Sequence, residues 1–162
     1  MTAALLPTLV GATLASGLIA GFLAGLAHTV MPGLGATDDV TFVGAFQALD
    51  RAVYNPWFMA PFTLAPFLVS AALLLALGDQ QLGAAVLIAA ALVLAVATVG
   101  ITGVVHMPLN RELGDVALSA GALDLAHARA RFEHRWVQWH VVRTMTSTGA
   151  FACLALALLL VH

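Results

Sequence analysis

Four long apolar stretches, separated by shorter polar segments, dominate the hydrophobic pattern of the chain. They are Leu5–Val30, Pro56–Leu77, Leu82–Val105 and Val137–Val161. Each is long enough to cross a hydrocarbon core of roughly 30 Å, which takes about 20 residues of helix. The pattern predicts an all-α fold, a four-helix transmembrane bundle that forms a single domain over residues 1–162.

The composition also indicates a membrane protein. Of the 162 residues, 62% are hydrophobic and 9% are charged, whereas soluble domains carry about a quarter charged residues. The first stretch has no basic residue ahead of it and exceeds the apolar region of a secretion signal, so it is expected to remain as a span. The formal net charge of −2, without a basic run, argues against nucleic acid as a partner and leaves the lipid bilayer as the expected one.

The basic residues suggest an orientation in the membrane. All six are arginines, and they lie between the first two spans, between the last two, or just inside the fourth. In an up-down-up-down bundle those two connections share one face, and the "GDQQ" connection on the other face has no basic residue. The positive-inside rule predicts cytoplasmic arginine-bearing connections and outside termini, in what we expect to be a bacterial inner membrane.

Shorter helices are expected in the connections. Asp38 or Asp39 is placed to cap "VTFVGAFQALDRAVYN", whose apolar residues recur at roughly helical spacing. This predicts an amphipathic helix that lies on the membrane surface or roofs the bundle. A partly helical connection is expected over Glu112–His134, and Pro108 is expected to bend the third span near residue 104.

Small residues mark one face of the first span. Gly17, Gly21 and Gly25 are spaced four apart and form a smooth face against which another backbone can pack. Helix packing within the bundle is the ordinary interpretation, and the same face permits a homo-oligomer. His28 follows Gly25 by three residues and lies near this face.

Polar residues of three spans fall at one depth, near the arginine-bearing end. One stripe, in four-residue steps, is Thr98, Thr102, His106 and Asn110, and another, in three- and four-residue steps, is Glu133, Trp136, His140, Arg143 and Ser147. Intramembrane ionisable groups cost about 2.5 to 3.5 kcal/mol each, so they face a bundle interior or a wet cavity and usually mark function. The simplest arrangement is one polar pocket between the four helices.

Two chemistries suit such a pocket. Neutral imidazole binds zinc, copper or iron, so His28, His106 and His140 are candidate ligands of a metal ion, and any of them is a candidate axial ligand of haem. Without metal, His140 or His106 is a candidate base for a weakly acidic substrate, while Arg143 and Asn110 hold the resulting oxygen anion. The candidate substrate-binding residues are Trp136, Trp139, Thr102 and Phe62.

Several of these residues also have ordinary roles in membrane proteins. Arg143 is within reach of the lipid headgroups, and Trp136 and Trp139 are typical interfacial anchors. Thr102 is able to bond to its own helix. Three histidines that arrive from different spans at one depth are harder to explain in this way, which favours a functional site.

Four stretches in order, "GFLAGLAHTVMPGLGATDD", "FVGAFQALDRAVYNPWFM", "ITGVVHMPLNRELG" and "RWVQWHVVRTMTSTGAF", resemble the anthrone oxygenase-like family of small four-helix membrane proteins. The most specific elements are "MPLNREL" and "WVQWHVVRT". The resemblance implies an oxidoreductase that uses dioxygen to oxidise the central carbon of an anthrone to a quinone, without an organic cofactor. His106 and His140 stand where asparagine is common in the family, and this departure modestly favours the metal alternative.

The expected function is therefore a membrane-embedded oxygenase that acts on a lipophilic aromatic or quinone-like substrate. Its cofactor is expected to be dioxygen alone, or dioxygen with a copper or iron ion or haem. The competing interpretation is a non-catalytic membrane protein that binds haem, metal, quinone or lipid. A small transporter is disfavoured because the chain has neither repeated halves nor paired broken helices.

Overall fold

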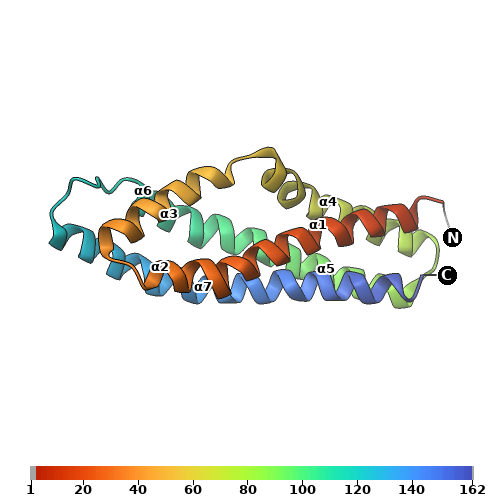
Figure 1. Cartoon of the computed structure of the whole chain (residues 1–162). Helices are drawn as coiled ribbons and strands as arrows, with labels where there is room; N and C mark the ends of the chain where they lie inside the picture. Colours follow the sequence, from red (N-terminus) through yellow and green to blue (C-terminus); the bar gives the residue numbers. More distant parts are fainter. Residues whose placement is uncertain (1–2, 162) are drawn as a thin grey trace.

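The computed structural model describes residues 3–161, whose regular structure is entirely helical (Figure 1). Four helical segments are long and apolar enough to cross a membrane, which makes the chain an integral membrane protein. The predicted four-helix transmembrane bundle is confirmed. In chain order the elements are α1 (Leu5–Gly25), the π-helical turn η1 (Leu26–Val30), α2 (Met31–Gly35), α3 (Asp39–Val53), α4 (Pro56–Gly78), α5 (Leu82–Ile101), the π-helical turn η2 (Thr102–His106), α6 (Met107–Gly114) and α7 (Ala122–Leu158).

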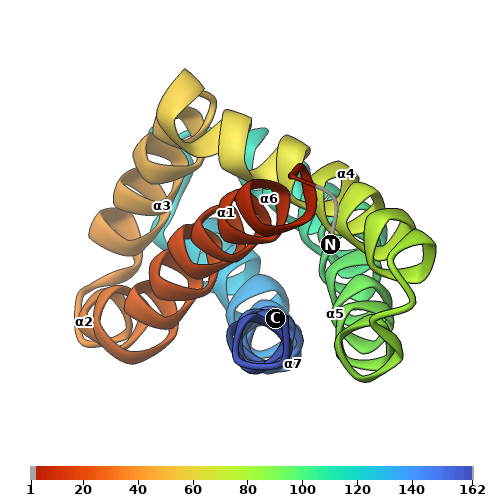
Figure 2. The ribbon, with the colours of Figure 1, turned by 90° about the vertical axis from the view of Figure 1, so that its right-hand side faces the viewer.

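The four spans form a closed ring. α7 packs against α5 and α1, and α4 packs against the same two helices on the opposite side. In the end-on view of Figure 2, α2 and α3 lie to one side of α1, and α4 and α5 lie to the other. The connection between α4 and α5 lies at one end of the bundle, and the α2–α3 and α6–α7 connections lie at the other (Figure 1). The two arginine-bearing connections therefore share one end, as the up-down pattern requires.

α7 is much longer than the span predicted from the sequence. Its 37 residues extend over about 55 Å at 1.5 Å per residue, against roughly 30 Å of hydrocarbon. The run predicted over Val137–Val161 corresponds to the second part of this continuous helix, which ends at Leu158, and the first part is long enough to project beyond the bilayer. The connection expected over Glu112–His134 consists of the end of α6, a short loop and this first part of α7.

The amphipathic helix predicted after Asp38 is α3, and it packs against protein. Phe42 and Phe46 on its buried face meet Phe132 of α7, with ring centroids 6.2 and 4.5 Å away. The same helix contacts α6. Of the two predicted positions, the structure therefore adopts the roof: α3 covers the extended part of the bundle with its apolar face turned inward.

Capping side chains fix the starts of α3 and α4. The Asp38 carboxylate accepts the Thr41 N–H at 2.8 Å, which confirms Asp38 as the cap. This hydrogen bond lowers the pKa of the Asp38 carboxyl below its ordinary value. Its contribution to stability is therefore present at neutral pH and is lost as the pH falls through the lowered pKa. The Asn55 side chain caps α4 by accepting the N–H groups of Trp57 and Phe58.

Arg129 fastens the extended part of α7 to the α2–α3 connection. Its guanidinium donates to the carbonyls of Gly35 and Thr37, both at 2.8 Å. It also pairs with Asp39 at 3.1 Å and with Glu133 at 2.7 Å. One side chain thus satisfies carbonyls at the end of α2 and holds the start of α3 against α7.

The predicted glycine face is mostly open within the chain. A Cβ added at Gly17 would approach the Phe151 ring to 3.0 Å, so this position does allow a close contact. A Cβ at Gly21 or Gly25 would meet nothing within 4 Å. The buried face of α1 instead follows the steps Leu5, Leu9, Ala12, Ser16, Ile19 and Leu23.

Two π-helical turns interrupt the first and third spans, and each ends directly before a Met-Pro pair. In η1 the Met31 N–H bonds to the Leu26 carbonyl, and in η2 the Met107 N–H bonds to the Thr102 carbonyl. Proline lacks an N–H and its ring collides with the carbonyl four residues earlier, so a turn widened by one residue relieves the clash. The distortion predicted from Pro108 takes the form of this π turn.

Two apolar clusters fill the interior. The first lies among the four spans and includes Leu9, Val69, Ile88 and Leu154, and the second lies where α3, α6 and α7 meet and includes Phe42, Leu113 and Phe132. On α7, the last buried residue of the second cluster is Trp136, and the earliest buried residue of the first cluster is Ala150. The buried residues of α7 between these two positions are all polar. The candidate site lies in this polar layer.

Candidate functional site

Side chains from η2 and α7 meet in the polar layer. His106 and His140 are each 1% exposed, and Arg143 is 7% exposed. The two imidazole rings lie edge to face with centroids 5.9 Å apart. The Trp136 ring stacks on His140 at 4.5 Å and meets His106 at 5.1 Å. Four residues predicted for the site on the third and fourth spans therefore lie together.

His140 has partners on both ring nitrogens. Its Nε2 lies 3.0 Å from the Leu23 carbonyl of α1, and its Nδ1 lies 2.8 Å from Nη2 of Arg143. A carbonyl only accepts and a guanidinium only donates, so these partners assign the proton to Nε2 and the lone pair to Nδ1. His140 is thus a neutral bridge between α1 and Arg143, with neither nitrogen free for a metal ion or a substrate proton.

Arg143 is a buried cation without an anionic partner. Its Nη1 donates to the Thr102 hydroxyl at 3.3 Å and its Nη2 to His140, while its Nε has no hydrogen-bond partner among residues 3–161. Over the same residues no carboxylate lies within ion-pair distance of it. A buried charge of this kind is costly unless something compensates it, so the arrangement favours an anionic ligand beside Arg143.

His106 offers the free imidazole nitrogen of the site. Its Nδ1 makes a long hydrogen bond of 3.4 Å with the Ile101 carbonyl, which assigns the proton to Nδ1. Its Nε2 is buried and has no partner among the residues that the structure describes. The π turn brings the ring to a carbonyl five residues earlier, a spacing that a regular α-helical turn does not supply.

Asn110 is held in a hydrogen-bond chain behind Trp136. Its Nδ2 donates to the Asp50 carboxylate at 2.6 Å, and its Oδ1 accepts the indole N–H of Trp136 at 2.8 Å. This chain links α3, α6 and α7 and fixes the indole plane that stacks on His140. Both ends of the Asn110 amide are thus engaged, and its anion-holding role stays a prediction.

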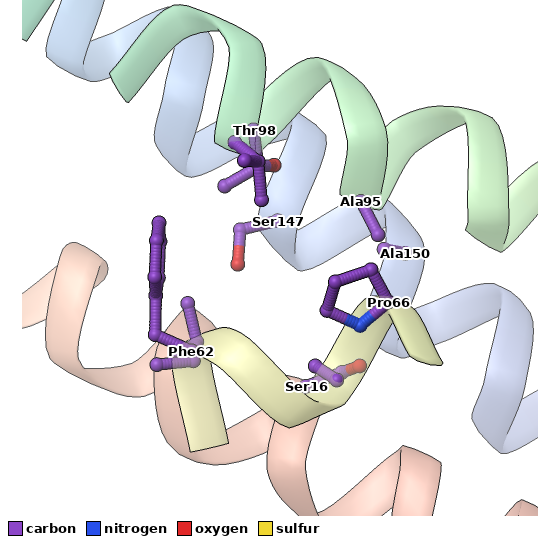
Figure 3. A pocket seen from close by; sticks show the side chains of 10 residues that line it. Ser16, Phe62, Pro66, Ala95, Thr98, Ser147 and Ala150 are labelled. Atoms are coloured by element: carbon purple, nitrogen blue, oxygen red, sulfur yellow. The ribbon is translucent and has the colours of Figure 1, made fainter. Parts of the chain in front are cut away.

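A small cavity lies among the four spans, with Phe62, Pro66, Thr98 and Ser147 around it (Figure 3). It has room for about 30 Å³, above the roughly 10 to 15 Å³ that a cavity needs to hold a single water molecule. Its lining residues come from all four spans and are Ser16, Ile19, Phe62, Ala65, Pro66, Ala95, Thr98, Val99, Ser147 and Ala150. Ser147 follows Arg143 by one helical turn, and Thr98 precedes Thr102 by one turn. The cavity is therefore about one turn deeper in the bundle than Arg143.

The remaining predicted residues are distributed differently. Thr102 contacts the cluster, because its hydroxyl accepts a hydrogen bond from Arg143. Phe62 lines the cavity. Trp139 is 40% exposed, whereas Trp136 is buried. His28 is exposed on η1.

The predicted three-histidine metal site is not assembled in this geometry. Among residues 3–161, no group of three His, Cys, Asp or Glu side chains is placed to hold a metal ion. The physical reason is that His28 is exposed, while the two nitrogens of His140 are taken by Leu23 and Arg143. The Arg143 guanidinium beside the two rings also disfavours a second cation at this place and leaves it as the group that can bind an anion.

Sequence reasoning missed three contributors to the site. The Leu23 carbonyl orients His140, Asp50 orients Asn110, and Ser16 lines the cavity with a hydroxyl that has no partner among the described residues. Ser16 and Leu23 share the buried face of α1, whose steps of three and four residues were available in the sequence. The role of a backbone carbonyl leaves no signal in residue type.

The comparisons with known proteins place the chain in a family. No curated protein and no solved structure matches it. The model of one family, described as anthrone oxygenase, matches residues 53–153, which include every side chain of the His106, His140 and Arg143 cluster. Since this match covers more than half of the chain, the protein belongs to the anthrone oxygenase family.

Proposed function

We propose that the protein is a membrane-embedded oxygenase that uses dioxygen to oxidise a lipophilic aromatic molecule of the anthrone type to the quinone. The observation that carries the proposal is the pair formed by Arg143, a buried cation without a carboxylate, and His106, whose Nε2 is unpartnered among the described residues. A base beside a cation is what conversion of a carbon acid into its anion requires. The family match supports the choice of substrate class.

The proposed reaction balances with dioxygen as the sole oxidant. Nε2 of His106 removes a proton from the central methylene of the anthrone. The negative charge moves onto the carbonyl oxygen on the opposite side of the central ring, where the Arg143 guanidinium stabilises it. The carbanion passes an electron to dioxygen, and the two radicals combine to form a carbon–oxygen bond. His106 returns its proton to the outer peroxide oxygen, and loss of the second methylene hydrogen with cleavage of the O–O bond then gives the quinone carbonyl and one water. Each turnover consumes one anthrone and one dioxygen.

The geometry suits the two histidines to different roles, one as the base and one as the residue that positions Arg143. His106 is the proposed base because its Nε2 is free. His140 is a proposed positioning residue, since its Nδ1 holds Nη2 of Arg143 and its Nε2 is tied to α1. Trp136, stacked on His140 and fixed by Asn110, is proposed as a wall of the substrate site.

We further propose that the substrate enters laterally from the bilayer and that the end bearing Arg129 faces the cytoplasm of a bacterial cell. The arginines gathered at that end support this orientation. A cysteine introduced at the exposed Arg131 should react with a membrane-impermeant thiol reagent in inverted membrane vesicles and stay unlabelled in intact spheroplasts. The reverse labelling pattern would overturn the orientation.

Dioxygen consumption tests the proposed function directly. The purified protein in detergent, given an anthrone, should take up one dioxygen and form one anthraquinone per molecule, at a rate well above that of empty micelles. The micelle control is needed because anthrones oxidise slowly without a catalyst. With ¹⁸O₂ the new carbonyl should carry one labelled oxygen. Binding of the anthrone without acceleration would instead make the protein a non-catalytic binder.

A further inference from the structure

The cavity beside the cluster contains a buried hydroxyl that the proposed chemistry does not use. Ser16 is 5% exposed, and its Oγ has no hydrogen-bond partner among residues 3–161. Other hydroxyls in the spans bond to their own helix, such as Thr13 to the Leu9 carbonyl at 2.7 Å and Ser70 to the Pro66 carbonyl at 2.8 Å. A buried hydroxyl that is not bonded to its own helix keeps its hydrogen-bonding capacity for a molecule that enters the cavity.

The dimensions of the cavity restrict what the hydroxyl can meet. Room for about 30 Å³ admits a single oxygen-bearing substituent and excludes an aromatic ring. In Figure 3 the Ser147 hydroxyl points into the space between Phe62 and Pro66. The other lining side chains are mostly apolar, so few polar groups are present that could select one substituent of a ligand over another.

The mouth of the cavity is suited to the ring that would carry this substituent. Val99 is 40% exposed and Phe62 is half-buried, so both reach the edge of the bundle. Among the lining residues of α4 and α5 they are the furthest from the connection that joins these two helices. An aromatic molecule seated between them would lie about one helical turn from the level of Arg143.

We propose that this cavity is a specificity subsite for one hydroxyl or carbonyl substituent on the ring of an aromatic ligand, with Ser16 as its hydrogen-bonding partner. The inference rests on the proposed function, because the ring that carries the substituent is taken to be the substrate. It adds a reason for the enzyme to prefer oxygenated polycyclic molecules over their unsubstituted parents. A buried polar group that only the substituted ligand satisfies discriminates against the analogue that lacks the group.

The test compares the wild-type protein with Ser16→Ala on two anthrones. The wild type should show a lower KM for 1,8-dihydroxyanthrone than for unsubstituted anthrone. Ser16→Ala should raise the KM for the dihydroxy compound by about 3- to 10-fold and leave the unsubstituted compound unchanged, as expected for loss of one hydrogen bond. The melting temperature of Ser16→Ala should stay close to that of the wild type, because the hydroxyl makes no hydrogen bond to the other residues that the structure describes.

Two further variants separate a ligand contact from a packing effect. Ser70→Ala removes a hydroxyl that is bonded to the Pro66 carbonyl, and it should leave the substrate preference intact. Ser16→Thr keeps the hydroxyl and should retain at least part of the preference. A Ser16→Ala protein that binds both anthrones less well, and melts earlier, would show a structural role and overturn the subsite.

A binding measurement keeps this inference separate from the proposed function. Quenching of tryptophan fluorescence by 1,8-dihydroxyanthraquinone and by unsubstituted anthraquinone needs no turnover. If no dioxygen is consumed but the dihydroxy compound binds more tightly in a Ser16-dependent way, the subsite stands and the oxygenase proposal falls. If dioxygen is consumed and Ser16→Ala keeps the wild-type preference, the oxygenase stands and the subsite falls.

Discussion

Arg143→Met should lower kcat for anthrone oxidation by at least about 100-fold while the protein remains as stable as the wild type. Loss of one preorganised donor to a developing oxyanion costs about 10²- to 10³-fold in characterised enzymes. Stability should change little because two effects offset each other: the substitution removes a costly buried charge that has no ionic partner among the described residues, but it leaves the Nδ1 of His140 without its donor. Dioxygen uptake and thermal unfolding in detergent measure the two effects.

The matched control for this prediction is Arg135→Met. Arg135 lies on the same helix two turns earlier and is exposed, so its loss should change neither quantity. Arg143→Lys is informative in the other direction: it keeps the charge but loses the planar fork that reaches Thr102 and His140 together, and it should restore only part of the rate. Strong destabilisation of Arg143→Met with a normal rate per folded molecule would remove Arg143 from the reaction.

The missing counter-ion links the fold to the chemistry. The Arg129 guanidinium, near the end of the bundle, has two carboxylates and two carbonyls around it, whereas Arg143 has a hydroxyl and a neutral imidazole. A carboxylate beside Arg143 would cancel most of the positive electrostatic potential that stabilises an anionic intermediate. Because water is excluded, the same charge acts over a lower effective dielectric than at the surface, so it stabilises a developing anion more strongly.

Much of the fold could be predicted because long apolar runs in lipid have few alternatives. The buried stripe of α7 was also predictable, since Trp136, His140 and Arg143 follow steps of four and three residues. The same rule places Trp139 off the stripe, one residue before His140 and so about 100° around the helix. Its 40% exposure follows from this angle, which turns it away from Trp136 although both are substrate-binding candidates by sequence.

Other features of the site lay beyond the reach of spacing rules. The stripe from Thr98 to Asn110 assumed a continuous α-helix, but the π turn before Met107 inserts a residue and rotates α6 relative to α5. Asn110 therefore meets Asp50 and Trp136, and His106 reaches the Ile101 carbonyl. Which histidine keeps a free nitrogen depends on such single contacts, so residue types could only leave both histidines as candidates.

His106→Ala should reduce kcat by about 10²- to 10⁴-fold near neutral pH, the range attributed to a positioned general base. The deficit should shrink as the pH rises, because a growing fraction of the anthrone then ionises in solution and enters as the anion. The Arg143→Met deficit should not shrink, since the anion still lacks its electrostatic partner. Profiles of kcat against pH for the wild type and both variants, corrected for oxidation in empty micelles, provide the measurement.

His140→Ala distinguishes the base from the residue that positions Arg143. Because His140 carries the proton on Nε2 and offers its lone pair to Arg143, its removal should misplace the guanidinium and lower kcat without recovery at high pH. If His140→Ala recovers at high pH and His106→Ala does not, the roles of the two rings are exchanged. That result would require Arg143 to leave Nδ1 of His140 when substrate binds, and the Nε2 of His106, unpartnered within residues 3–161, would then need another explanation.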